Sequence, residues 1–402
     1  MKTKTLIFLI IILGILVGAG ILIIRKKAPE RSEGRMGAQL LEQLPANRIA
    51  SIIIKSSDDS VSLVKEKGQW VVKTRFDYPA DFDKITDLVR KFKGVTAGRK
   101  FASSEDTLRR LSLQDPDDPD APGDQKGVRI YFKDEKYRTL SNILLGKTRM
   151  RGEERSYPDG QYLMLGQESE IYLIDKHFLS LGKDSSAWLE KRLVKVGEDE
   201  IKKIVCMSAD GKKRRYLFER PDKGKDLEPV DLSTNRTIEK SALRRLTGAL
   251  SSLRLEDVVK PLDDSESGDM EISSLLEYHL FDGTLYRVFP GKTRLKEDMY
   301  YLKLEVDYQR PSGVKEKGDT DKSSKKEDRS NEVSTKEAQK VKGSKKHETS
   351  EEKTPEEYAL DAKKMNARLS PWIYVIPKGQ HEAFITDLEQ LLEKPDKKTK
   401  KE

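Results

Sequence analysis

The same order of strand and helix signals occurs twice in this 402-residue chain, and this duplication restricts the possible folds more than any other feature. The first copy covers about residues 48–195 and the second about residues 196–392. In each copy, β-branched and aromatic runs separated by glycine, aspartate and serine flank one amphipathic helical pattern. Strand pairs, a helix and further strand pairs predict an α+β fold with antiparallel pairing rather than a doubly wound parallel sheet.

The helical pattern of the first copy is the clearer of the two. Asp81 ends a Tyr-Pro-Ala-Asp turn and is a suitable N-cap. Behind it, apolar residues at positions i, i+3, i+4 and i+7 predict an amphipathic helix that ends at Gly94. These apolar residues are Ile85, Leu88, Val89 and Phe92. Strand signals lie over residues 49–72 before this helix and over residues 128–174 after it.

The second copy repeats these signals. Residues 201–206 match the apolar run at residues 49–54, and Asp282-Gly283 between two strand patterns predicts a tight hairpin turn. The letters Gly-Lys-Thr-Arg occur at residues 146–149 and again at residues 291–294. One helix is expected on Ile238, Ala242, Leu246, Leu250 and Leu253. A last helix is expected on Phe384, Ile385, Leu388, Leu391 and Leu392.

A charged segment interrupts the second copy. Between Pro311 and Glu357 the chain has no Leu, Ile, Met, Phe, Tyr or Trp, and lysine, glutamate, aspartate and serine dominate. Such a segment cannot bury enough apolar surface to offset the entropy lost on ordering. We therefore predict a mostly disordered insert over residues 311–369, and a lysine-rich tail over residues 393–402.

An uninterrupted apolar run stands near the amino terminus. It begins at Leu6, ends at Ile24 and contains no charged residue. As a helix it would be roughly 28 Å long, which is close to the thickness of the hydrocarbon core of a bilayer. We predict a membrane anchor within residues 1–27, with the lipid bilayer as its partner, and a linker over residues 28–47.

Two properties of this anchor follow from its residues. Gly14 and Gly18 form a G-x-x-x-G spacing that would allow a homodimer face, although glycine is also simply frequent in membrane helices. Lys2 and Lys4 precede the apolar run, and five basic residues follow it by Arg35. The local charge count keeps the body in the cytoplasm, whereas a short lysine-bearing start is typical of a signal-anchor that exports it. The residues leave both orientations open.

The composition limits the classes of function. The chain has 77 basic and 69 acidic residues, a net charge of +8, and a charged insert without aromatic residues, so no nucleic acid is expected as a partner. Cys206 is the single cysteine, which excludes an intrachain disulfide, and its apolar strand predicts an inert buried thiol. The four histidines are His177, His279, His347 and His381. They have no metal-binding spacing, and we predict neither a metal nor a cofactor.

Two motifs resemble binding loops only superficially. A phosphate-binding loop needs G-x-x-x-x-G-K-[ST] between a strand and a helix, but Ser141 and Tyr286 stand where the first glycine is required. A structural turn shared by both copies is the preferred interpretation. The acidic loop over residues 115–124 lacks the ligand order of a calcium loop. The sequence thus offers no catalytic, cofactor-binding or metal-binding residue.

Several of these motifs together resemble the bacterial domain-of-unknown-function family 4340. They are the single N-terminal anchor, the Gly-Gln sequence before Trp70, the turn that ends at Asp81, the Gly-Lys-Thr strand end at residues 146–148, the strand at residues 171–173, and Trp188-Leu189 before residues 192–194. The resemblance covers most of residues 48–310 and resumes near residue 371, so the insert departs from the family pattern. It transfers no site residue, because none of these motifs is catalytic.

The resemblance implies a setting rather than a reaction. Similar proteins are held by one N-terminal helix, with the body outside the cytoplasmic membrane, and are often encoded beside ABC-type permeases and gliding-motility-type subunits. We expect a non-enzymatic, membrane-anchored extracytoplasmic scaffold or binding protein that is accessory to an ABC-type transport system. One alternative is an extracytoplasmic enzyme or ligand sensor with a pocket between the copies. Another is a cytoplasm-facing, membrane-tethered binder of polyanions.

Overall fold

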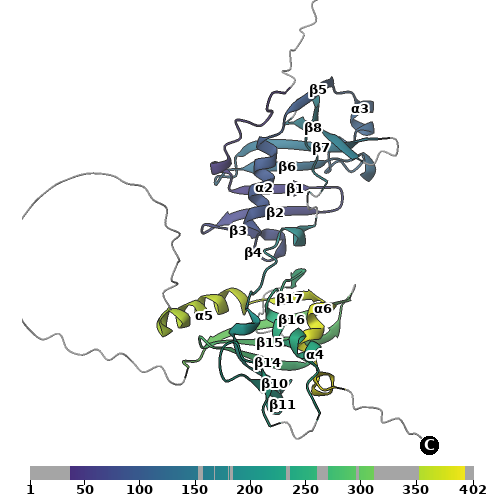
Figure 1. Cartoon of the computed structure of the whole chain (residues 1–402). Coiled ribbons are helices and arrows are strands. Elements are labelled where there is room, and N and C mark those ends of the chain that lie inside the picture. The colour runs from purple at the N-terminus through teal and green to yellow at the C-terminus, as the bar shows by residue number, and fades with distance from the viewer. Residues whose placement is uncertain are drawn as a thin grey trace, which may run out of the picture. The chain divides into compact units, whose positions relative to one another are not determined.

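The computed structural model of the chain describes residues 37–152, 157–166, 168–179, 181, 184–231, 236–259, 270–295, 298–311 and 353–393. The chain divides into two compact units, unit 1 (Met1–Glu190) and unit 2 (Lys191–Glu402). Each unit is built on one large antiparallel sheet, labelled in Figure 1.

The sheet of unit 1 has nine strands in the order β4-β3-β2-β1-β6-β7-β8-β9-β5. Every neighbouring pair is antiparallel. The strands are β1 (Ser51–Lys55), β2 (Ser60–Glu66), β3 (Gln69–Val72), β4 (Tyr78–Pro79), β5 (Ala97–Ala102), β6 (Val128–Lys133), β7 (Thr139–Arg151), β8 (Tyr157–Leu165) and β9 (Glu170–Ile174).

The sheet of unit 2 has eight strands in the order β12-β11-β10-β14-β15-β16-β17-β13, again antiparallel throughout. The strands are β10 (Ile201–Ser208), β11 (Arg214–Glu219), β12 (Glu228–Pro229), β13 (Asp257–Val259), β14 (Ser274–Leu280), β15 (Thr284–Arg294), β16 (Met299–Tyr308) and β17 (Ile373–Pro377).

The two sheets share one topology. The order β1-β6-β7-β8-β9-β5 in unit 1 corresponds to β10-β14-β15-β16-β17-β13 in unit 2. In both, the strand that follows the first helix lies at the edge of the sheet and pairs with the last strand of the unit. The duplicated order of sequence signals therefore corresponds to a duplicated order of strands.

Helix α2 (Phe82–Lys93) covers the sheet of unit 1, as Figure 1 shows beside β1 and β6. It begins as expected, because the Asp81 carboxylate accepts a hydrogen bond from the Lys84 backbone N–H at 3.0 Å. The predicted apolar face is confirmed, with Ile85, Leu88 and Phe92 buried and Val89 half-buried. The Phe92 ring meets Phe132 of β6 edge-on, with ring centroids 5.5 Å apart. Burying a side chain of this size stabilises the fold by about 1.5–3 kcal/mol.

Unit 2 contains helices α4 (Lys240–Thr247), α5 (Pro355–Leu369) and α6 (Lys378–Phe384). Two buried tyrosines of the sheet bind helix ends through their hydroxyls. Tyr278 donates to the Leu246 carbonyl at 3.2 Å, and Tyr374 donates to the Leu369 carbonyl at 2.8 Å. A further short helix, α3 (Glu105–Arg110), belongs to unit 1 and was not expected from the sequence.

The structure corrects the predicted fold class. The described residues form two large antiparallel sheets with few helices, so the protein is mainly β rather than α+β. The prediction gave too much weight to one strong helical pattern in each copy, although eight or nine strands form the framework of each unit.

The predicted anchor over residues 6–24, with Gly14 and Gly18, lies outside the described residues. Within the described ranges, no helix combines the length and the apolar character needed to cross a bilayer.

In unit 2, the extents of the predicted disordered insert and of the predicted last helix are also wrong. The insert was expected to continue to residue 369, but residues 355–369 form α5, with a capping box between Thr354 and Glu357 at its start. Residues 312–352 lie outside the described part of the chain. The expected last helix is interrupted, because α6 ends at Phe384 and a separate 3₁₀ turn begins at Leu388. A second capping box, between Asp387 and Gln390, starts this new turn.

Candidate functional site

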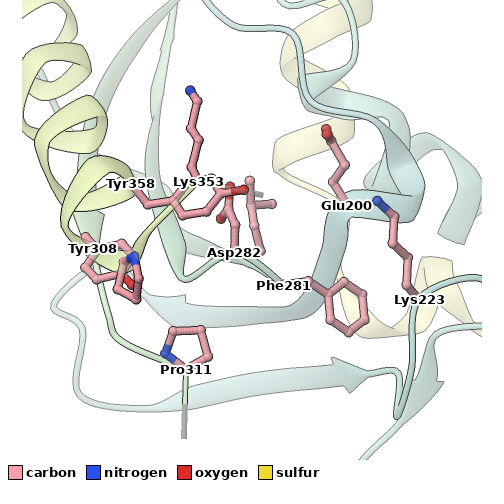
Figure 2. A pocket seen from close by; sticks show the side chains of 10 residues that line it. Glu200, Lys223, Phe281, Asp282, Tyr308, Pro311, Lys353 and Tyr358 are labelled. Carbon is pink, nitrogen blue, oxygen red and sulfur yellow. The ribbon is translucent and has the colours of Figure 1, made fainter. Parts of the chain in front are cut away.

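A pocket of about 460 Å³ lies in unit 2, beside the turn between β14 and β15. Strand β16 ends at it and helix α5 begins at it. Its charged and aromatic lining consists of Glu200, Lys223, Phe281, Asp282, Tyr308, Lys353 and Tyr358. In the view of Figure 2, Asp282 lies in the middle of these side chains, with Tyr308 and Tyr358 on one side and Phe281 on the other.

The predicted hairpin turn fixes the position of Asp282. The Asp282 carboxylate accepts a hydrogen bond from the Thr284 backbone N–H at 2.8 Å. Gly283 has a φ of +91°, which favours glycine. A Cβ atom at Gly283 would stand 2.5 Å from the Gln309 carbonyl oxygen and 2.8 Å from the Tyr308 ring. The missing side chain therefore lets Tyr308 pack directly on the turn and brings its ring into the same pocket as Asp282.

Tyr308 contributes a hydroxyl group whose hydrogen-bonding capacity is unused in the described structure. Its hydroxyl oxygen is buried and has no hydrogen-bond partner among the described residues. Burial raises the pKa of Tyr308. The positive charge of Arg310 opposes this effect, and the negative charges of Glu356 and Asp282 reinforce it. The hydroxyl is therefore protonated at neutral pH and can both donate and accept a hydrogen bond. An unpartnered buried hydroxyl costs about 1–3 kcal/mol, so a bound polar group would relieve this cost.

The two lysines of the lining are already accompanied by carboxylates. Lys353 Nζ lies 2.7 Å from the Asp361 carboxylate, a pair that raises the pKa of Lys353 and lowers that of Asp361. Lys223 Nζ lies 3.8 Å from the Asp199 carboxylate. Asp282, by contrast, forms no ion pair with any described residue. Both lysine charges are thus offset by carboxylates outside the lining, whereas the Asp282 charge is not offset by an ion pair within the described part of the chain.

The lining combines carboxylates with aromatic rings, which is an arrangement suited to recognition of a cation. Carboxylates beside the rings of Phe281 and Tyr308 form the kind of site that attracts a cation. The Tyr358 ring already has a cation over it, because Lys353 Nζ lies 5.9 Å from its centroid. No histidine, cysteine or serine is among the described residues that line the pocket.

The two Gly-Lys-Thr-Arg sequences have a structural role. Each lies inside a long strand, β7 or β15, at an interruption of the pairing register, and no helix follows it directly. In both copies the lysine backbone N–H donates to a carbonyl of the preceding segment at 2.7 Å, to that of Leu111 in unit 1 and of Glu271 in unit 2. A structural turn was predicted at these residues. The structure places them instead in strands, at an irregularity of the pairing that both copies share.

The remaining motifs also have local roles. In the acidic loop, Asp115 pairs with Arg129 at 2.8 Å and Asp117 pairs with Lys55 at 2.7 Å, so these carboxylates fasten the loop to the sheet. Cys206 is buried in β10, and burial raises the pKa of its thiol, as expected for an inert cysteine. Among the described residues, no three histidine, cysteine or acidic side chains cluster as a metal site would require. His347 lies outside them.

Sequence reasoning missed the aromatic residues of the pocket. The sequence places Tyr358 in the predicted insert and indicates only a turn at Asp282. The signal that could have placed Tyr358 is the Thr354-Pro355 helix start with Glu357 three residues after the cap. The meeting of Tyr308 and Tyr358 follows only from the packing of α5 against β16.

Comparison with known proteins gives one match. The family model described as Domain of unknown function (DUF4340) matches residues 70–271. The search of curated proteins and the search of solved structures give no match to the chain. The matched range begins in β3 and ends before β14, so the turn that carries Asp282 lies beyond it.

Proposed function

The chain belongs to the DUF4340 family, and we propose that it is a non-enzymatic binding protein whose pocket in unit 2 holds a basic group of a partner. The single observation that carries this proposal is the position of Asp282. Its carboxylate is fixed by the turn, lies among three aromatic rings, and has no cationic partner among the described residues. A lysine or arginine side chain would supply that cation.

The energies expected for such a contact are sufficient for specific but reversible binding. A cation over an aromatic ring contributes about 0.5–2 kcal/mol, depending on how far it is desolvated. A hydrogen bond between charged groups contributes about 1.5–3 kcal/mol. The Tyr308 hydroxyl adds a neutral donor or acceptor beside the same cation. Together these terms support an anchor residue of a protein–protein contact more than a site for chemistry.

For the cellular setting we propose the cell envelope, with an ABC-type permease as the partner. This part of the proposal is supported by the family resemblance and not by the geometry of the pocket. Chemical crosslinking in intact cells, followed by identification of the crosslinked chains, tests it. The alternatives of a pocket between the two copies and of a cytoplasmic polyanion binder stay predictions from the sequence.

Binding of a labelled peptide tests the pocket directly. The full chain is titrated against a short lysine- and arginine-containing peptide, and fluorescence anisotropy reports the dissociation constant. Asp282→Asn is the informative variant, because an Asn-Gly pair forms the same kind of turn. We expect binding at least tenfold weaker, about 1.4 kcal/mol, in this variant. Asp87→Asn, at an exposed site on α2, is the matched control and should bind like the parent. Equal binding by all three proteins would refute the proposal.

A further inference from the structure

A second pocket in unit 2 has a lining of the opposite kind. It encloses about 290 Å³ and is lined by residues of α4, of the 3₁₀ turn Gly248–Leu250 that follows it, and of α6. Its polar side chains are those of Arg244, Arg245, Ser252 and Gln380. No carboxylate is among the described residues that line it.

Neither arginine of this pocket is used elsewhere in the described structure. The described residues form no ion pair or side-chain hydrogen bond with Arg244 or Arg245. Glu239, whose charge interacts with that of Arg245, is occupied at the start of α4, where its carboxylate accepts from the backbone N–H groups of Ser241 and Ala242. Two guanidinium groups therefore reach one hollow with their donors free.

The amide of Gln380 is oriented so that it adds another donor. Its Oε1 atom accepts a hydrogen bond from the Arg254 backbone N–H at 2.9 Å. With the oxygen engaged, the remaining end of the amide is Nε2, which carries two N–H groups. The Ser252 hydroxyl can also donate. Every polar side chain of the lining can thus offer a hydrogen to the same bound group.

From this lining we infer that the pocket between α4 and α6 binds a phosphate group. Guanidinium groups match the geometry of phosphate oxygens, and charge-assisted hydrogen bonds are about twice as strong as neutral ones. The donors of two arginines, Gln380 and Ser252 exceed the number of hydrogen bonds that one carboxylate can accept, which favours a phosphate over a carboxylate. The two positive charges of the arginines also balance the charge of a phosphate monoester. This site is independent of the acidic pocket beside Asp282 and takes a ligand of opposite charge.

Gly379 provides a sharp test, because a Cβ atom at this position would meet nothing within 4 Å. Gly379→Glu places a carboxylate in the hollow, where it competes with the phosphate, and Gly379→Gln is a neutral control of the same size. Both residues favour a helix more than glycine does, so α6 should be kept. Arg245→Gln is a second variant, which removes one guanidinium without filling the pocket.

Isothermal titration calorimetry of the full chain with glycerol 3-phosphate measures the effect. We expect the parent and Gly379→Gln to bind, and Gly379→Glu and Arg245→Gln to bind at least tenfold more weakly. Phosphatidylcholine vesicles with and without phosphatidic acid show whether the phosphate comes from a lipid headgroup or from a soluble molecule. Binding to either source that is lost in Gly379→Glu supports the site. The inference is overturned if the parent binds neither probe, or if Gly379→Glu binds as tightly as Gly379→Gln.

Discussion

The imidazole of His381 is hydrogen-bonded to the carbonyl oxygen of Gly291, with Nε2 2.7 Å from that oxygen. Unit 1 has the same contact with a different residue, because Gln161 Nε2 donates to the Gly146 carbonyl at 2.8 Å. Both carbonyls belong to the Gly-Lys-Thr-Arg sequences, so each copy secures its strand irregularity with a side-chain donor. Gln161 also accepts a hydrogen bond from the Phe178 backbone N–H, whereas Nδ1 of His381 has no described partner.

This difference predicts a pH-dependent stability of unit 2. Burial lowers the pKa of His381 below its ordinary value of 6.5, despite the opposing effect of the hydrogen bond to Gly291. Because the folded state disfavours protonation, the contribution of His381 is complete above about pH 6.5 and is lost as the pH falls through the lowered folded pKa. In His381→Gln the donor is kept without a titrating group. Urea unfolding at pH 7.5 and pH 5.5 should show a larger loss of stability in the parent than in this variant.

The pH experiment contains its own control. His279 is also buried enough for its pKa to be lowered, but it titrates in both proteins and its effect therefore cancels. An equal pH dependence in the parent and in His381→Gln would show that protonation of His381 is not coupled to unfolding.

The turn at Gly283 predicts a large effect of a small substitution. In Gly283→Ala the new methyl group would meet the Gln309 carbonyl at 2.5 Å, and the positive φ would be strained as well. Strain at such a position costs about 1–3 kcal/mol, and the steric overlap adds to it. Gly211→Ala is the matched control, because φ there is +67° but nothing lies within 4 Å of the added atom. Chemical unfolding should show that Gly283→Ala loses clearly more stability than Gly211→Ala. Equal losses would mean that strain alone matters at Gly283.

Helix α5 predicts where the charged insert can be shortened. It is held to the sheet at several points, since the Asn366 side chain accepts from the Val306 backbone N–H at 2.9 Å and Tyr286 donates to the Met365 sulfur at 3.0 Å. Replacing residues 315–350 by a short Gly/Ser linker should change the melting temperature by less than about 5 °C, because loop closure depends only weakly on length.

Extending that replacement to residue 369 removes α5 and should lower the melting temperature far more. The extended replacement also removes Arg368, which donates to the Leu193 carbonyl at 2.7 Å. If both replacements were equally tolerated, the packing of α5 would be unimportant for stability.

Local signals predicted those parts of the fold in which neighbouring residues decide the structure. The cap at Asp81 and the spacing of Ile85, Leu88 and Phe92 specify α2, and the Asp282-Gly283 pair specifies its turn. Helix α5 was missed because charge composition was given more weight than the cap at Thr354. Composition describes the average of a segment, whereas a capping box is a local signal within four residues, here Thr354 to Glu357.

The candidate site could not be predicted, because its residues come from separate elements. Tyr308 ends β16, Tyr358 lies in the first turns of α5, and Asp282 stands in a turn between β14 and β15. Their meeting depends on strand order and on helix packing, which a single sequence does not encode in local patterns. The same holds for Arg245 and Gln380, which the sequence separates by most of unit 2.

The central claim is that the pocket beside Asp282 binds a cation, and changing the ligand tests it most directly. The full chain is titrated with one peptide in two forms, with free lysine and with acetyllysine, at the same ionic strength. Acetylation removes the charge but keeps most of the side chain. The lysine peptide is predicted to bind at least tenfold more tightly, and this preference should disappear in Asp282→Asn. Equal affinity for both peptides in the parent chain, or an unchanged preference in Asp282→Asn, would contradict the claim.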